Sequence, residues 1–286
     1  MSTRTYRPSG VLKFEDCPRA FYYQYVEGIR SVGVSSNLVF GTAVHTAVTG
    51  YLDGSVSDPE TKFREEWAAG IEKAEVHYTS RFGPDDLEAI GASLCDQFPE
   101  AWQDTGLVPL VDAQGPVIER RFKAEVAPSV YLSGQLDIAA MNCDGDVQLV
   151  DVKTPASVPD VIWQSDQLTG YQLLIEEHKQ ELGIESVTKV GFMNLLKRKV
   201  PTGKSRSKGP EIQPIEFLPA RKSEDVLEYK QKIRWMDEDV VKGRFPRRGR
   251  MAHNTPCGMC DFAGLCLNGD WEGLEQPQQQ AVANLV

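Results

Sequence analysis

A run of strand-like segments between positions 116 and 154 constrains the fold more than any other part of the chain. The segments are "PVIERRFKAEV", "VYLSGQLDIAAM" and "VQLVDVKT", which are rich in β-branched and aromatic residues. The last two are joined by "NCDGD", and an Asp-Gly pair is a strong signal for a tight hairpin turn. The sequence therefore predicts strands over 116–126, 130–141 and 147–154, with the last two paired as a hairpin.

Helical segments flank these strands on both sides. A fourth strand is predicted over 189–199. Helices are predicted over 10–27, 40–52, 60–104, 165–183 and 223–243. In a chain of 286 residues this order indicates one α/β domain, with a central mixed sheet flanked by helices.

Three charged side chains on the predicted hairpin suggest chemistry. Asp151 and Lys153 are two residues apart on one strand, so they share a face, and Asp137 lies on the preceding strand. Two carboxylates that converge with a lysine form a hard oxygen site suited to Mg²⁺ or Mn²⁺. Such a metal can polarise a phosphodiester and acidify a water, while the lysine orients that water or neutralises developing charge. An Asp-x-Lys pair taken alone is more often a surface salt bridge.

The distribution of charge bears on binding to polyanions. The net charge is −10, but residues 53–104 alone hold 13 acidic and 4 basic residues, which leaves the rest nearly neutral. Two acid-free basic runs follow, with six Lys or Arg over 197–208 and five over 242–250. A nucleic acid responds to such local patches, although solvated loops have the same composition. The candidate nucleic-acid-binding residues are Lys204, Arg206, Lys208, Arg247 and Arg248.

Cysteine spacing indicates a second metal centre. The N-terminus "MSTRTYRPSG" has no apolar segment and no apolar run reaches the length of a membrane span, so we expect a cytoplasmic protein with no membrane partner. In a reducing compartment, closely spaced cysteines are more often metal ligands or catalytic groups than disulfides. Cys257, Cys260 and Cys266 have C-x2-C-x5-C spacing, which leaves one thiolate missing from a set of four.

The order of these motifs resembles the PD-(D/E)xK nuclease superfamily, and in particular its RecB-like branch. That family's pattern is a helical His, a G-x-x-D strand, a (D/E)-x-K strand and a Q-x-x-x-Y helix. The matching residues are His45 in "GTAVH", Asp137 in "GQLD", Asp151 and Lys153 in "DVK", and Gln167 and Tyr171 in "QLTGY". The resemblance implies a restriction-endonuclease-like core.

The resemblance also implies a role for each matching residue. His45, Asp137 and Asp151 would hold Mg²⁺ or Mn²⁺, and Lys153 would assist the attacking water. Gln167 and Tyr171 are four apart, so on a helix they share the face beside the active site. His45 taken alone would more often be a buried core histidine. Glu119 falls where members often have an acidic residue, and its role is left open.

The iron–sulfur members of this branch supply a model for the fourth thiolate. The AddB-type and CRISPR-associated RecB-like nucleases take one cysteine from the N-terminal helical region and three from the C-terminus. Cys17 in "FEDCPRAFYYQY" matches the first, so the resemblance implies a [4Fe–4S] cluster on Cys17, Cys257, Cys260 and Cys266. Spacing alone also allows zinc, and Cys17 alone could be a buried core thiol. Cys95 and Cys143 are expected to be structural residues that do not bind the cluster.

The resulting hypothesis is a metal-dependent deoxyribonuclease, acting as an exonuclease on single-stranded DNA or DNA ends. One nuclease domain is expected over 1–267, with an acidic helical insert over about 53–104 and a mobile tail over 268–286. The iron–sulfur module would combine about 9–30 with 244–267 and join the two chain ends. The alternatives are a DNA-end-binding or processing subunit of a recombination, repair or CRISPR-adaptation complex, and a zinc-stabilised nucleic-acid-binding protein.

Overall fold

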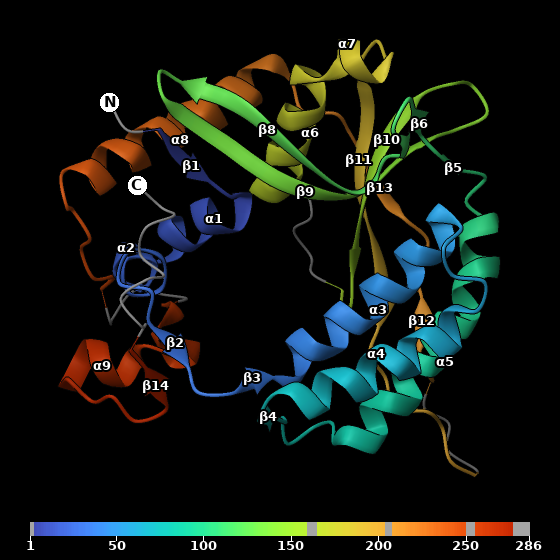
Figure 1. Ribbon diagram of the computed structural model, residues 1–286, viewed down its shortest axis with the longest axis horizontal. Helices are drawn as coiled ribbons and strands as arrows, with labels where there is room; N and C mark the ends of the chain where they lie inside the picture. The colour runs from blue at the N-terminus through green and yellow to red at the C-terminus, as the bar shows by residue number, and fades with distance from the viewer. Residues whose placement is uncertain (1–2, 159–164, 204–207, 250–254, 277–286) are drawn as a thin grey trace.

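The strands predicted over 116–154 form the middle of one mixed sheet (Figure 1). The computed structural model describes residues 3–158, 165–203, 208–249 and 255–276. The strands of this sheet are β1 (Arg4–Tyr6), β5 (Val108–Pro109), β8 (Ile118–Ala127), β9 (Val130–Met141), β10 (Val147–Lys153), β11 (Val187–Leu196), β12 (Glu211–Ile212) and β13 (Glu216–Pro219). Short pairs outside it are β2 (Arg30–Ser31) with β14 (Leu274–Glu275), β3 (Val34–Ser35) with β4 (Val76–His77), and β6 (Val111–Asp112) with β7 (Gly115–Pro116).

The sheet contains both parallel and antiparallel pairs. β8, β9 and β10 are antiparallel neighbours, whereas β11 runs parallel to β10 and β1 runs parallel to β9. All residues of β10 except Lys153 are buried, as expected for a strand covered on both faces. The predicted α/β architecture with a mixed central sheet is therefore confirmed.

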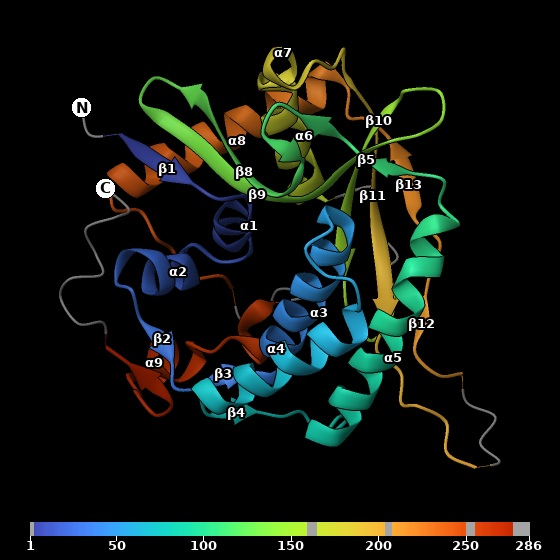
Figure 2. The same ribbon diagram turned by 45° about the vertical axis from the view of Figure 1, so that its right-hand side comes forward.

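Helices cover both faces of the sheet (Figures 1 and 2). They are α1 (Pro8–Asp16), α2 (Pro18–Phe21), α3 (Ser36–Asp53), α4 (Pro59–Lys73), α5 (Pro84–Gln103), α6 (Asp166–Glu177), α7 (Lys179–Leu182), α8 (Ser223–Val241) and α9 (Ala263–Asn268), with a π-helical turn (Tyr22–Val26) and a 3-10 turn (Pro256–Met259). Residues of α1, α6 and α8 form one apolar core with the sheet, and residues of α3, α4 and α5 form the other. None of the described helices combines the length and apolarity that a membrane crossing requires.

The acidic segment 53–104 contains the two helices α4 and α5, separated at 74–83 where one helix was predicted over 60–104, and it forms a large part of the second core. Its two helices bury Phe63, Trp67 and Phe98 against α3 and the sheet. The acidic side chains occupy the outer faces of α4 and α5, so an amphipathic pattern accounts for the local charge. The segment is thus part of the fold's main body.

The described N-terminal and C-terminal segments lie side by side, with α2 and β2 near α9 and β14 (Figure 1). The predicted helix 10–27 is divided at Cys17, which is extended because the following Pro18 disfavours a helical conformation at the preceding residue. A small apolar cluster joins Cys17 to Phe262, and β14 pairs with β2. The predicted tail over 268–286 therefore begins later than expected, since Leu274 and Glu275 are paired; residues 277–286 lie outside the described residues.

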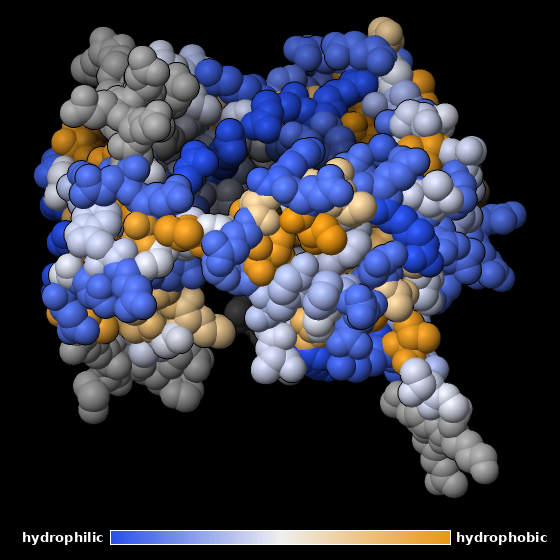
Figure 3. Space-filling model, turned by 60° about the horizontal axis from the view of Figure 1, so that its bottom comes forward, coloured by the Kyte–Doolittle hydropathy of each residue, from blue (hydrophilic) through white to orange (hydrophobic). Residues whose placement is uncertain are grey.

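The molecule is hollowed between the part formed by the chain ends and the part that contains α3 (Figure 3). A cavity of about 910 Å³ lies there, lined by Tyr25 and Phe262 on one side and by Ser35 and Leu38 on the other. Leu38 also lines the next cavity along α3, so the two hollows adjoin.

Candidate functional site

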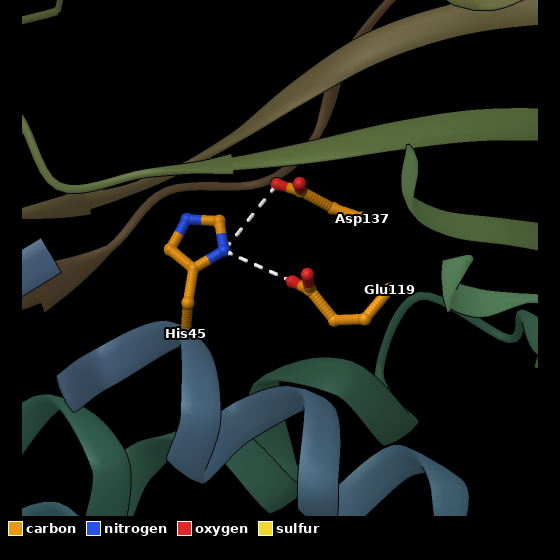
Figure 4. A group of neighbouring side chains, drawn as sticks. All are labelled: His45, Glu119 and Asp137. Atoms are coloured by element: carbon orange, nitrogen blue, oxygen red, sulfur yellow. Dashed lines mark hydrogen bonds and ion pairs between the residues drawn. The ribbon is translucent and has the colours of Figure 1, made fainter. Parts of the chain in front are cut away.

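The side chains of His45, Glu119 and Asp137 meet on the wall of a cavity of about 720 Å³ (Figure 4). His45 comes from the middle of α3, Glu119 from the start of β8 and Asp137 from β9. His45 Nδ1 lies 3.4 Å from Glu119 Oε1 and 3.6 Å from Asp137 Oδ2. One ligand atom from each residue lies within 4.8 Å of the others, so the three could hold one metal ion.

A hydrogen bond fixes the orientation of the His45 ring. Nε2 lies 2.8 Å from the carbonyl oxygen of Val152. Because a carbonyl only accepts, the proton of a neutral imidazole must be on Nε2. The lone pair of Nδ1 then faces Glu119 and Asp137, which is the arrangement that a metal-binding histidine requires.

The electrostatics of the group favour a bound positive charge. Burial, followed by the charge of Asp151, raises the pKa of Asp137 to about 7. Burial lowers the pKa of His45, but Glu119, Asp137 and Asp151 together outweigh it and raise that pKa to about 9. The raised pKa values of Asp137 and His45 mean that these groups favour a bound proton when no other cation is present.

Asp151 and Lys153 lie beside this group. The Asp151 side chain is 1% exposed, and burial raises its pKa while Lys153 opposes that change. Lys153 Nζ pairs with Asp151 Oδ2 at 2.6 Å, which partly neutralises the buried carboxylate.

The predicted Gln-Tyr helix face contacts the same carboxylate. Gln167 on α6 donates from Nε2 to Asp151 Oδ1 at 3.2 Å and to Tyr171 Oη at 2.8 Å. Across the hairpin, Asp137 Oδ2 accepts the Val152 N–H at 2.8 Å. The structure thus brings together all six residues that the motif order selected.

Glu119 enters the site through an unusual backbone conformation. Its φ is +48°, in the left-handed region that non-glycine residues rarely adopt. Ile118 and Arg120 pair with β9 on either side of it, and its second carboxylate oxygen accepts from Gln135 Nε2. The sequence left the role of Glu119 open and missed Gln135, although Gln135 is two residues from Asp137 and so lies on the same face of β9.

A separate cavity of about 240 Å³ is lined by all four cysteines of the predicted cluster. These are Cys17, Cys257, Cys260 and Cys266. Cys95 is buried in the second core, where burial raises its pKa, and Cys143 is exposed in the hairpin turn. The structure therefore brings together the four thiols that the resemblance selected and leaves out the other two.

The predicted DNA-binding residues have mixed surroundings. Arg247 and Arg248 line the cysteine cavity, and Arg248 donates to the main-chain carbonyls of Glu15 and Asp16 at the end of α1. Lys208 is exposed, whereas Lys204 and Arg206 lie outside the described residues. Earlier members of the same basic run have protein partners: Lys197 contacts Asn37, Arg198 pairs with Glu211 and Lys199 pairs with Asp86.

Comparison with known proteins identifies the family. A family model described as the PD-(D/E)XK nuclease superfamily matches residues 7–267. The chain belongs to this superfamily. Membership in the PD-(D/E)XK superfamily implies metal-dependent hydrolysis of phosphodiesters, and the group of His45, Glu119 and Asp137 could hold a metal ion.

Other comparisons add little to the superfamily assignment. Among curated proteins, no sequence matches the chain. A solved structure described as "Crystal structure of SSO0001" is 11% identical, over 93% of this chain and 87% of that chain. Its TM-score of 0.37 is too low to support an argument about this PD-(D/E)XK protein.

Proposed function

We propose that the chain is a deoxyribonuclease of the RecB-like iron–sulfur branch, which acts as an exonuclease on single-stranded DNA or DNA ends. The observation that carries the nuclease assignment is the group of His45, Glu119 and Asp137 on an open cavity wall, with Asp151 and Lys153 beside it. The choice of DNA ends and of the RecB-like branch rests on the motif order and on the four cysteines.

The donor set fits Mg²⁺ or Mn²⁺. His45, Glu119 and Asp137 would hold the ion, and Asp151, which the sequence also selected as a ligand, lies beside them and pairs with Lys153. Carboxylates suit both ions, and an imidazole ligand favours Mn²⁺ over Mg²⁺. The bound ion would supply Lewis-acid chemistry, by polarising the phosphodiester and lowering the pKa of a water.

The protein's own groups hold the reacting atoms in place. The Lys153 ammonium lies beside Asp151 and its side chain is partly exposed, so it can neutralise charge that develops on a phosphate bound there. Gln167 holds the other oxygen of Asp151, so the carboxylate and the ammonium keep a fixed relation. The Val152 carbonyl oxygen fixes the orientation of the His45 ring through its hydrogen bond with Nε2.

The cysteine cavity fits a [4Fe–4S] cluster. Four thiols from the N-terminal and C-terminal segments line this cavity, together with the basic side chains Lys13, Arg19 and Arg247. Positive groups stabilise the negative charge of a thiolate-ligated cluster. A zinc ion on the same thiols is the competing proposal, and colour separates them, because a zinc protein is colourless.

The test is an anaerobic preparation incubated with Mg²⁺ or Mn²⁺ and with single-stranded, double-stranded or circular DNA labelled at one end. We expect brown protein, release of short products from linear single strands, little cleavage of circles, and no cleavage in EDTA. An Asp151→Asn protein from the same preparation controls for contaminating nucleases. A wild-type protein that cleaves no DNA in either metal would overturn the proposal.

Glu119 provides a sharper test of the metal site. Glu119→Gln should raise the Mn²⁺ concentration needed for half-maximal cleavage by about tenfold or more, because one negative ligand is lost. Glu125→Gln on the same strand is the matched control, since Glu125 is not among the described residues that line the cavity and accepts a hydrogen bond from Ser129 N. Equal Mn²⁺ requirements in the two variants would exclude Glu119 from the site.

A further inference from the structure

Lys197 is a buried ammonium group close to the catalytic cavity. The residue is 5% exposed, and its Nζ lies 2.5 Å from Asn37 Oδ1 and 5.3 Å from the centre of the Phe40 ring. Asn37 lines the cavity that also holds His45 and Asp137. The sequence placed Lys197 at the start of an acid-free basic run and near the end of the predicted strand 189–199, and its burial emerges only in the structure.

No carboxylate compensates this charge. Among the residues that the structure describes, none with a carboxylate lies within ion-pair distance of Lys197, and its hydrogen-bond partner is the neutral Asn37. Burial, and then the positive charge of Arg81, lower the pKa of Lys197. The adjacent N-terminus of α3 adds a further positive potential. A buried cation in such surroundings is costly unless an anion joins it.

The contact with Lys197 also decides which way the Asn37 amide points. A lysine ammonium only donates hydrogen bonds, so the atom it contacts must be Oδ1. The NH₂ group therefore lies at the other end of the amide, and the described residues offer it no acceptor. The side chain is exposed at the cavity, where this donor is available to a ligand.

The position of Asn37 excludes a role at the reacting phosphate. Asn37 precedes His45 by eight residues on α3, which corresponds to about 12 Å along the helix. A ligand at Asn37 and a phosphodiester at His45 would occupy different parts of one cavity. A DNA strand presents a phosphate at every nucleotide, so a single strand in the cavity can reach both.

We propose that Asn37 and Lys197 form a binding subsite for a non-scissile backbone phosphate of the DNA strand. Asn37 donates its amide NH₂ to a phosphate oxygen, and Lys197 orients that amide and attracts the anion. This inference rests on the proposed nuclease function for its ligand. It concerns binding, so it can be tested without cleavage.

The first variant is Asn37→Asp. An aspartate gives Lys197 a counter-ion and suits the first turn of a helix, so the melting temperature should be unchanged or higher. The same aspartate removes the donor and repels phosphate, so the Kd for a fluorescent single-stranded oligothymidine in EDTA should rise about tenfold or more. A merely structural contact would leave the Kd unchanged.

The second comparison is Lys197→Met with Lys199→Met. Each variant removes one positive charge from the same segment, but Lys197 contacts Asn37, which lines the cavity, whereas Lys199 pairs with Asp86, which is not among the cavity's described lining residues. Lys197→Met should lower the slope of log K against log salt by about 0.7, and Lys199→Met should leave it unchanged. If the wild type cleaves DNA, the Asn37→Asp variant should have a higher KM and a kcat within about twofold of wild type. The reason is that the lost contact binds the substrate and the transition state equally.

The outcomes separate the two proposals. If the wild type binds DNA without cleaving it, the nuclease proposal fails and the binding measurements still decide the subsite. If Asn37→Asp binds as tightly as wild type, the subsite is overturned even when cleavage is normal. If the wild type neither binds nor cleaves, both are overturned.

Discussion

At the residue scale, burial determines what the Asp151–Lys153 pair can do. Asp151 is 1% exposed and the Lys153 side chain is 38% exposed, so the lysine is open to solvent while the carboxylate stays in the sheet. The ammonium opposes the rise in the pKa of Asp151 that burial causes. Each member of the pair therefore affects stability and, in the proposed enzyme, cleavage.

Lys153→Met tests this coupling. We expect cleavage to fall by more than about 100-fold, because the charge facing the phosphate is lost. Burial raises the pKa of Asp151 and Lys153 opposes the rise, so without the lysine the folded protein holds the carboxyl proton to higher pH. The unfolded chain releases that proton, so the variant loses stability as pH rises above the ordinary range of an aspartate.

Urea unfolding in EDTA measures the effect. The variant should be less stable than wild type by about 1–3 kcal/mol at about pH 8, and by less at about pH 5. Adding Asp151→Asn should remove this pH dependence without restoring cleavage. A stability deficit that is equal at both pH values would contradict the coupling.

At the element scale, the segment after β11 divides into two parts with different surroundings. Lys197, Arg198 and Lys199 contact Asn37, Glu211 and Asp86, so they serve the protein's own packing or its cavity. The exposed Lys208 closes the run, beyond residues that lie outside the described ranges. Composition alone could not separate these parts, because their charges are the same.

The residues from Lys204 to Lys208 are the candidate phosphate-binding segment. Replacement of Lys204, Arg206 and Lys208 by alanine should weaken binding to single strands of any sequence. If each residue contacts one phosphate, the slope of log K against log salt should fall by about 2. Fluorescence anisotropy over a salt series measures the slope, and an unchanged slope would assign these residues to solvated surface.

At the scale of the whole molecule, the cysteine cavity lies where the two chain ends meet. Cys17 precedes Pro18 in the N-terminal segment, and the other three thiols belong to the C-terminal segment. A further ion pair joins the N-terminal segment to α8, where Arg4 lies 2.5 Å from Asp237. A metal centre that binds only the folded protein adds its binding free energy to folding.

Cys17→Ala should therefore lose the brown colour and lower the melting temperature. Activity should fall with the structure, since the cysteine cavity shares no lining residue with the cavity that holds His45. Cys143→Ala is the matched control, because that thiol is exposed in the hairpin turn and should leave colour and stability unchanged. A Cys17→Ala protein with full iron content would point to another fourth ligand: Cys95, Cys143 or His253, of which His253 lies outside the described residues.

The sequence by itself determined the hairpin and its catalytic face. Side-chain alternation and the Asp-Gly turn are local properties, so they placed Asp137, Asp151 and Lys153 together without further information. The order of the motifs along the chain added His45 and Gln167 through the family resemblance. These features could be predicted because each depends on a short stretch of residues.

Only the tertiary structure decided the contacts between distant segments. Glu119 joins the metal group because a left-handed residue turns its side chain toward His45, 74 residues away. Lys197 becomes a buried charge because β11 ends against Asn37, 160 residues earlier. Such contacts depend on how helices and strands pack in space, and the packing free energy is spread over the entire core, so no local pattern in the sequence reports them.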